Sequence, residues 1–373
     1  MREMHKLSKT TEERKVSNNI EAGSHSQSLG AILTHEQYER IYNACLKKGH
    51  TKSKDDAISK KSWLNCFALK EKGIKVFLFA KHGQYYRIRI QLDSSLTIDK
   101  NAPTGLLINS KDIKKMTNGV DRALNDLNVP LKLDSMKMGR IDLTINIIFS
   151  SNKELMEYIR LLKKGRIIAK YKLSAFDPED NKAKDPDRAN EHSYCISCKS
   201  ASFFAYDKID ELEMVGRIPK NTIENNILRL EIQFKRPALK KHLGEEALES
   251  NEKLLSAAIQ KSAFVVAWYL KRMQPDCRKY LRYKDALTKI KKEQLSKHTR
   301  ERMLYLLRKT SDCETLNASI KKMKEKFSLS KSQCDTILKK FSKLGFSPIT
   351  LTNDSEYEEL PSFSVILSKS SAI

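Results

Sequence analysis

Three segments in the middle of the chain alternate apolar and polar residues, and this alternation constrains the fold more than any other feature. The segments cover residues 140–148, 202–208 and 227–236. Because successive side chains of a β-strand point to opposite faces, each segment predicts a strand with one apolar and one polar face. Antiparallel sheets commonly pack one face against helices and leave the other in water. We therefore expect an antiparallel sheet with one helix-covered face and one open, polar face.

The polar positions of these segments carry side chains that are suited to chemistry on phosphates. If the segments pair, one face collects two carboxylates, a phenol and an ammonium group, from Asp142, Glu231, Tyr206 and Lys208. Basic side chains flank this set and are candidates for binding DNA: Arg140, Arg229, Lys235 and Arg236. Carboxylates suit Mg²⁺ or Mn²⁺, a tyrosine hydroxyl can attack phosphorus, and lysine can stabilise developing charge. The alternative is a hydrated sheet face without chemistry, which has the same alternation.

The rest of the pattern divides the chain into a mixed part and a helical part. Two β-rich runs, 75–80 and 85–92, predict a hairpin around a glycine-containing turn, and helices are expected at 110–130 and 153–164. Helical periods then occupy the segments 254–273, 280–291, 300–308, 319–327 and 331–344. The sequence thus predicts an α+β fold, in which an antiparallel-sheet domain with packed helices precedes a mostly helical, basic domain.

Composition along the chain suggests four parts. Residues 1–30 are polar and serine-rich, and we expect them to form a disordered tail. The α+β domain is expected at 31–245, the helical DNA-binding domain at 246–350 and a C-terminal tail at 351–373.

The net charge indicates a polyanionic partner. The chain has 70 Lys and Arg against 46 Asp and Glu, a formal charge of +24. Nucleic acid and anionic membrane are the usual partners of such a protein. No apolar run is long enough to span a bilayer, and no basic amphipathic helix presents an aromatic face, so nucleic acid is favoured and a membrane is not expected. The N-terminal segment lacks the apolar core of a signal peptide, so we expect a cytoplasmic protein.

Basic residues are concentrated in the last third of the chain. Between residues 286 and 343 there are 16 Lys and Arg against 6 Asp and Glu, a net charge of 16 − 6 = +10. A short turn joins the last two expected helices, and Ser330 is placed to cap the second. DNA-binding proteins use helix–turn–helix units on such a background, although two packed surface helices would give the same pattern.

The alternating segments also resemble a known family. The motifs GRIDLT (139–144), AYDKIDEL (205–212) and LRLEIQFKR (228–236) are similar, in order and spacing, to motifs of the gene II/gene X replication proteins. These proteins occur in filamentous phages and in related plasmids and prophages of bacteria. A GFSPI stretch at 345–349 is similar too, so the resemblance spans roughly 70–350. The staphylococcal plasmid initiators show a more distant likeness.

This resemblance implies a site-specific DNA endonuclease that starts rolling-circle replication. Tyr206 would attack the scissile phosphate of the replication origin, keep the 5′ end as phosphotyrosine and release a 3′-OH primer. The substrate would be origin DNA in supercoiled and single-stranded form, and the strands would be rejoined at termination. Asp142 and Glu231 would hold Mg²⁺ or Mn²⁺, with Lys208 in catalysis and Glu211 in support. Many such nucleases use a His-hydrophobic-His metal pair, but none of the eight histidines forms one.

Two alternatives stay open at this point. Tyr280 and Tyr283, three residues apart in an expected helix, would share one helix face and are alternative nucleophiles. They could instead stack on bases of single-stranded DNA, as could Tyr85 and Tyr86 on the hairpin. The competing function is a non-enzymatic basic DNA-binding protein, such as a repressor or packaging factor. The chain has no GxxxxGKS or GxxxxGKT motif, so an initiator of this kind would need a host helicase.

Overall fold

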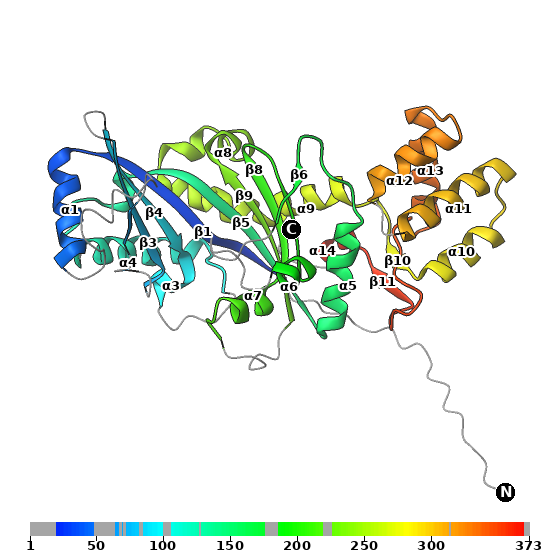
Figure 1. Cartoon of the computed structure of the whole chain (residues 1–373), viewed down its shortest axis with the longest axis horizontal. Helices are drawn as coiled ribbons and strands as arrows, with labels where there is room; N and C mark the ends of the chain where they lie inside the picture. Colours follow the sequence, from blue (N-terminus) through cyan, green and yellow to red (C-terminus); the bar gives the residue numbers. More distant parts are fainter. Residues whose placement is uncertain are drawn as a thin grey trace, which may run out of the picture.

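The computed structural model shows a mixed α+β architecture in which helices cover an antiparallel sheet and further helices follow it (Figure 1). This confirms the expected fold class. The described residues are 20–47, 64–66, 69, 72–81, 85–99, 106–126, 128–175, 186–218, 226–312 and 315–368.

The large sheet contains nine strands within the described ranges, in the order β2-β3-β4-β1-β5-β9-β8-β7-β6. Every neighbouring pair in it is antiparallel. The strands are β1 (Ile20–Leu33), β2 (Leu64–Cys66), β3 (Ile74–Lys81), β4 (Tyr85–Asp93), β5 (Lys137–Phe149), β6 (Lys172–Leu173), β7 (Ser193–Ser197), β8 (Ala201–Asp207) and β9 (Asn226–Lys235). The hairpin expected from the sequence is confirmed as β3–β4. The three alternating segments are confirmed as the adjacent strands β5, β9 and β8.

Strand β1 overturns the expected N-terminal boundary. Residues 20–30 fall in the expected disordered tail, but they belong to a strand that pairs with both β4 and β5. The segment is rich in small and polar residues, so its alternation is weak and its composition looks like that of a tail. The domain boundary at residue 31 is therefore wrong, while residues 1–19 lie outside the described part.

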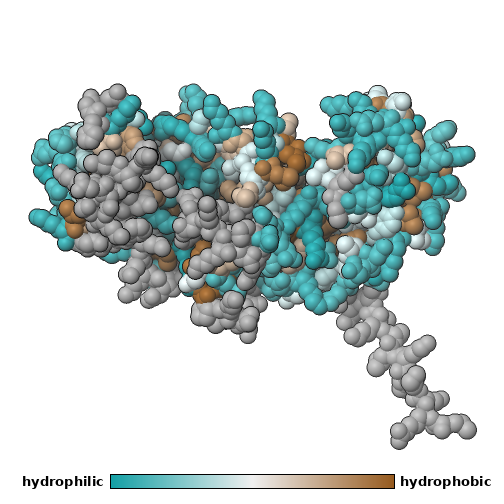
Figure 2. Space-filling model, viewed as in Figure 1, coloured by the Kyte–Doolittle hydropathy of each residue, from teal (hydrophilic) through white to brown (hydrophobic). Residues whose placement is uncertain are grey.

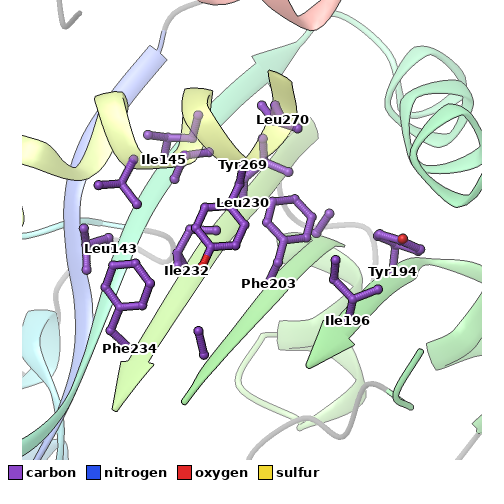
Figure 3. Packing of buried hydrophobic residues seen from close by; sticks show 14 of the residues in the cluster. Leu143, Ile145, Tyr194, Ile196, Phe203, Leu230, Ile232, Phe234, Tyr269 and Leu270 are labelled. Atoms are coloured by element: carbon purple, nitrogen blue, oxygen red, sulfur yellow. The ribbon is translucent and has the colours of Figure 1, made fainter. Parts of the chain in front are cut away.

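Helices pack on the apolar face of the sheet. Figure 3 shows Tyr269 and Leu270 on a helix that lies over the apolar side chains of β5, β8 and β9, among them Ile145, Leu230 and Phe203. This helix is α9 (Asn251–Met273), which contacts β1, β5 and β9. Other helices that contact the sheet are α1 (His35–Lys47), α5 (Asn152–Lys163) and α8 (Arg236–Leu243), while α4 (Ile113–Asp126) contacts α9. The expected boundary at residue 245 is wrong, because α9 belongs to the core of the sheet domain.

The last third of the described chain is helical, as expected. It contains α10 (Tyr283–Lys292), α11 (Lys297–Ser311), α12 (Leu316–Lys326) and α13 (Lys331–Lys343). The cap at Ser330 is confirmed, because its hydroxyl accepts a hydrogen bond from the backbone N–H of Gln333. Hydrophilic residues dominate the visible surface of this region (Figure 2). No helix within the described ranges is long and apolar enough to cross a membrane.

The expected C-terminal tail is wrong for most of its length. Strand β11 (Glu359–Pro361) pairs with β10 (Lys279–Leu281) in a second, two-stranded sheet. Helix α14 (Phe363–Ser368) follows and contacts α9. Its apolar residues Phe363, Ile366 and Leu367 are buried, so this end of the chain contributes to the core. Residues 369–373 lie outside the described part.

Candidate functional site

The polar face of the sheet aligns side chains from five neighbouring strands. The register places Glu21 of β1, Asn146 of β5, Arg229 of β9, Tyr206 of β8 and Ser193 of β7 in one row across the sheet. Directly opposite residues of antiparallel strands point to the same face. The next row pairs Thr144 with Glu231, and the row after it contains Asp142. The structure therefore brings the three motifs of the sequence to one face.

A connected chain of polar contacts runs along the first row and ends at the tyrosine. The Tyr206 hydroxyl donates a hydrogen bond of 2.7 Å to Oε1 of Glu231, and Nη1 of Arg229 lies 3.9 Å from the same oxygen. Arg229 Nε donates to the Asn146 side-chain oxygen at 2.9 Å. Asn146 Nδ2 in turn donates to Glu21 Oε2 at 3.0 Å. Strand β1 thus supports the site from the side opposite to Tyr206.

This polar face is buried, which corrects the expectation of an open face. The exposed fraction of Arg229 is 0%, that of Asp142 is 2% and that of Tyr206 is 5%. Helix α7 (Lys208–Met214) begins directly after β8 and contacts both β8 and β9. The period of two identifies the polar side chains of a strand but does not show what lies over them. Polar side chains out of water interact more strongly with one another, because the local dielectric constant is lower.

Burial controls the protonation of the central groups. It raises the pKa of Tyr206 well above its usual value, and the neighbouring Glu231 carboxylate raises it further while Arg229 opposes. Burial also raises the pKa of Glu231; Arg229 opposes this rise and Asp142 adds to it. The phenol is therefore protonated at rest. Its hydrogen-bond acceptor is a carboxylate whose basicity is also increased, so a base lies in direct contact with the phenol, while burial makes the phenol itself a weaker acid.

Lys208 lies next to the tyrosine. Its ammonium nitrogen is 6.0 Å from the centroid of the Tyr206 ring and forms an ion pair of 2.5 Å with Glu211. Both Lys208 and Glu211 are buried in the first turn of α7. Burial lowers the pKa of Lys208, and Glu211 opposes this. The AYDKIDEL motif therefore places the Tyr206 phenol and the Lys208 ammonium group at the junction between β8 and α7. Asp207, between them, caps the helix through its side chain.

Asp142 is held by a β-bulge in β1. Ser24 pairs with Leu143 and Gln27 with Ile141, so His25 and Ser26 together lie opposite Asp142. Ser26 donates a hydrogen bond to Asp142 Oδ2 at 2.5 Å. Arg140 Nη2 reaches the same oxygen at 3.3 Å and Ser26 Oγ at 2.7 Å. Bulges of this kind often re-aim side chains beside active sites.

His25 is a member of the cluster that sequence reasoning missed. Burial lowers its pKa well below the usual value, Arg229 and Lys208 lower it further, and Asp93 opposes. Its buried Nδ1 has no hydrogen-bond partner among the described residues. A neutral imidazole is a common metal ligand and proton acceptor. No sequence signal points to His25, because the strand pattern of β1 is itself weak.

The polar face offers two carboxylates, Asp142 and Glu231, as ligands for a divalent cation. No group of three or more His, Cys, Asp or Glu in the described ranges is arranged as a metal site. Asp142 and Glu231 are diagonal neighbours on β5 and β9, since Asp142 lies opposite Gln233. Mg²⁺ is commonly held by one or two carboxylates together with water and substrate phosphate. Two carboxylates on one face fit that requirement.

The flanking basic residues differ in exposure. Lys235 and Arg236 are exposed at the end of β9 and the start of α8, and Lys235 lies opposite Arg140. Arg229, by contrast, is completely buried and contacts Asn146. It therefore supports the site rather than facing solvent, which corrects the expectation that it is a DNA-binding residue.

The alternative tyrosines do not share a helix face. Tyr280 lies in β10, whereas Tyr283 is the first residue of α10. Tyr280 is fully buried, donates to the Gln274 side chain at 3.3 Å and packs edge-on against Tyr158. The three-residue spacing arises from a strand, a turn and a helix start, so the expectation of a shared helical face is wrong. Burial also raises the pKa of Tyr280 well above its usual value.

Neither protein-family models nor curated proteins gave a match to this chain.

Proposed function

We propose that the protein is a rolling-circle replication initiator that nicks one DNA strand with Tyr206 as nucleophile. The hydrogen bond from Tyr206 to Glu231 carries this proposal. A protonated phenol is a weak nucleophile, and a carboxylate in direct contact with its hydroxyl can remove the proton during attack. The raised pKa of Glu231 makes it a stronger base, and the raised pKa of Tyr206 opposes the transfer, so the direct contact between the two groups carries the proposal.

The reaction balances with the groups at the site. The Tyr206 oxygen forms a bond to the scissile phosphorus while the bond from phosphorus to the 3′ oxygen breaks. Glu231 takes the phenolic proton and returns a proton to the departing 3′ oxygen, which becomes the primer hydroxyl. The 5′ end stays on the protein as phosphotyrosine, and the reverse reaction rejoins the strands. Lys208 lies close enough to stabilise the charge that develops on the tyrosine and phosphate oxygens.

Asp142 and Glu231 would hold a divalent cation, Mg²⁺ or Mn²⁺, on the same face of the sheet. When bound, such an ion polarises the phosphate and neutralises part of its charge. The buried ion pairs and the β1 bulge keep both carboxylates in place.

The helical C-terminal region is proposed to hold duplex DNA. The turn between α12 and α13 contains Ser328, with a φ of 50°, and Leu329, which is buried. This tight turn sets α13 against α12 and α11, and Lys331 and Lys339 of α13 are exposed. The proposed partners are the replication origin, as supercoiled and single-stranded DNA, and a host helicase that unwinds the duplex.

A supercoiled plasmid that carries the replicon encoding this chain tests the proposal. With Mg²⁺, the wild-type protein is expected to produce nicked circles with protein attached to the 5′ end. The variant Tyr206→Phe is expected to produce none. The matched control is Tyr194→Phe, a buried tyrosine on β7, opposite Ala205 on the apolar face, which should nick normally. Wild-type nicking by Tyr206→Phe would overturn the assignment. A plasmid left intact by the wild-type protein would favour the non-enzymatic DNA-binding function.

A further inference from the structure

The polar face of the sheet continues beyond the candidate site onto β3 and β4, where aromatic and arginine side chains interleave. In the hairpin register, Phe77 lies opposite Arg89, Phe79 lies opposite Arg87, and Tyr85 begins β4. Phe77, Phe79 and Tyr85 are half-buried, and Arg87 is exposed. We call these five residues the aromatic–arginine surface.

The register shows that this surface and the candidate site share one face. Gln91, two residues beyond Arg89, lies opposite Ser28 of β1, and Ser28 in turn lies opposite Arg140 of β5. Arg140 contacts Asp142, and residues two apart on a strand point the same way. The opposite face of the hairpin is apolar and fully buried, with Ile74, Val76, Leu78, Ile88 and Ile90 in the core.

Rings and guanidinium groups contact one another across the surface. The guanidinium carbon of Arg87 lies 4.4 Å from the centroid of the Tyr85 ring, and that of Arg89 lies 4.5 Å from the Phe77 ring. The rings of Phe79 and Tyr85 are 5.6 Å apart. Such contacts hold flat aromatic faces and cations side by side at a surface that water reaches.

Tyr86 does not belong to this surface, although it follows Tyr85 directly. Its ring lies 5.0 Å from the rings of both His35 and Tyr38 on the α1 side of the sheet. The expectation that Tyr85 and Tyr86 together stack on bases therefore fails for Tyr86. Phe77 and Phe79, which the sequence did not single out, take its place.

We propose that the aromatic–arginine surface binds single-stranded DNA and leads it to Tyr206. Unpaired bases stack on aromatic side chains whatever their sequence, and arginines bind the phosphates or stack on bases in turn. The charge of the hairpin fits a polyanion, because β3 and β4 carry four basic residues and one acidic residue, Asp93, which pairs with Arg217.

The aromatic–arginine surface lies on the same face of the sheet as the site, so one single-stranded DNA can extend from the first to the second. Strand β4 is separated from β8, which carries Tyr206, by β1, β5 and β9. Four strand spacings of about 4.8 Å separate them sideways. Along β1, Ile32 lies in the row of Arg87 and Glu21 in the row of Tyr206, so the surface and the tyrosine are roughly 40 Å apart. A single DNA strand that occupies both has to cross that length of the sheet. The proposal that the DNA strand runs from this surface to Tyr206 rests on the proposed nicking function, whereas the proposal that DNA binds at the surface does not.

Fluorescence anisotropy with a labelled, mixed-sequence oligonucleotide of about 16 nucleotides tests the proposal. All proteins carry Tyr206→Phe and are measured without Mg²⁺, so that no cleavage contributes. Adding Phe79→Leu or Tyr85→Leu keeps an apolar side chain but removes the stacking face. Each is expected to raise the Kd for the single strand about 10-fold, and Arg87→Gln to reduce the salt dependence by about 0.7 in log–log slope.

The matched control is Phe264→Leu, because Phe264 is 65% exposed on α9, across the sheet from this surface. Its single-strand affinity should be unchanged, and melting curves should show that all variants fold. Unchanged affinity in Phe79→Leu and Tyr85→Leu would overturn the proposal, as would equal losses of affinity for single-stranded and duplex DNA. Failure of nicking by a wild-type protein that still binds through this surface would refute the nickase alone.

Discussion

At the scale of single residues, the site depends on how burial changes acid and base strength. Tyr206 and Glu231 are both buried, and one hydrogen bond joins them. In water the phenol would keep its proton to high pH and the carboxylate would be too weak a base to remove it. Burial raises the pKa of Glu231, which makes it a better acceptor, and raises the pKa of Tyr206 as well. Arg229 lies next to that carboxylate and is itself held by a hydrogen bond to Asn146.

The pH dependence of nicking follows from this pair. Only the ionised form of Glu231 can accept the proton, and the raised pKa moves ionisation to higher pH. The rate should therefore rise with pH through that raised pKa. Glu231→Gln is expected to lower the single-turnover rate about 10²- to 10⁴-fold and to abolish this rise. A variant that keeps the wild-type pH profile would show that another group is the base.

At the scale of single elements, β1 matters most, because it lies between the two halves of the sheet and supplies the bulge beside Asp142. Leu29→Asp places a charge in the core, where the side chain is 1% exposed, and should destabilise the protein by several kcal/mol or prevent folding. Ile32→Asp, on the same strand but 73% exposed, should change the free energy of unfolding by less than about 0.5 kcal/mol. Urea denaturation measures both. Similar stability of the two variants would contradict the central position of β1.

Helix α13 gives a second test at this scale. Replacing its exposed Lys331 and Lys339 by Gln should reduce the log–log salt slope for duplex binding by about 0.9 for each DNA phosphate that the variant no longer neutralises. The control exchanges the exposed Lys114 and Lys115 of α4, which lies in the sheet domain. Equal slopes in the two double variants would show that α13 does not contact the duplex.

What the sequence could predict differs from element to element for physical reasons. Alternation in β5, β8 and β9 is sufficient to place Asp142, Tyr206 and Glu231 on one face, because the side chains of a strand point to only two faces. It could not show that these side chains are buried, since contacts between distant segments leave no local pattern. Strand β1 was missed because small and polar residues fill a bulged, central strand, and His25 was missed with it.

At the scale of the whole molecule, we propose separate tasks for two surfaces and one buried cluster. The net charge of +24 favours binding of the protein to nucleic acid. We assign duplex DNA to the basic C-terminal helices, single-stranded DNA to the aromatic–arginine surface, and cleavage to the cluster around Tyr206. The sheet connects the last two, because both lie on its polar face.

We propose that Tyr206 becomes covalently linked to DNA, and mass spectrometry of the reacted protein can detect this linkage. The wild-type protein would be incubated with Mg²⁺ and plasmid DNA of its own replicon, digested with nuclease and protease, and its peptides analysed. We expect one modified peptide, in which Tyr206 carries the 5′-phosphate of a nucleotide. Nicked plasmid together with a linkage to any other residue, or with no linkage, would contradict it.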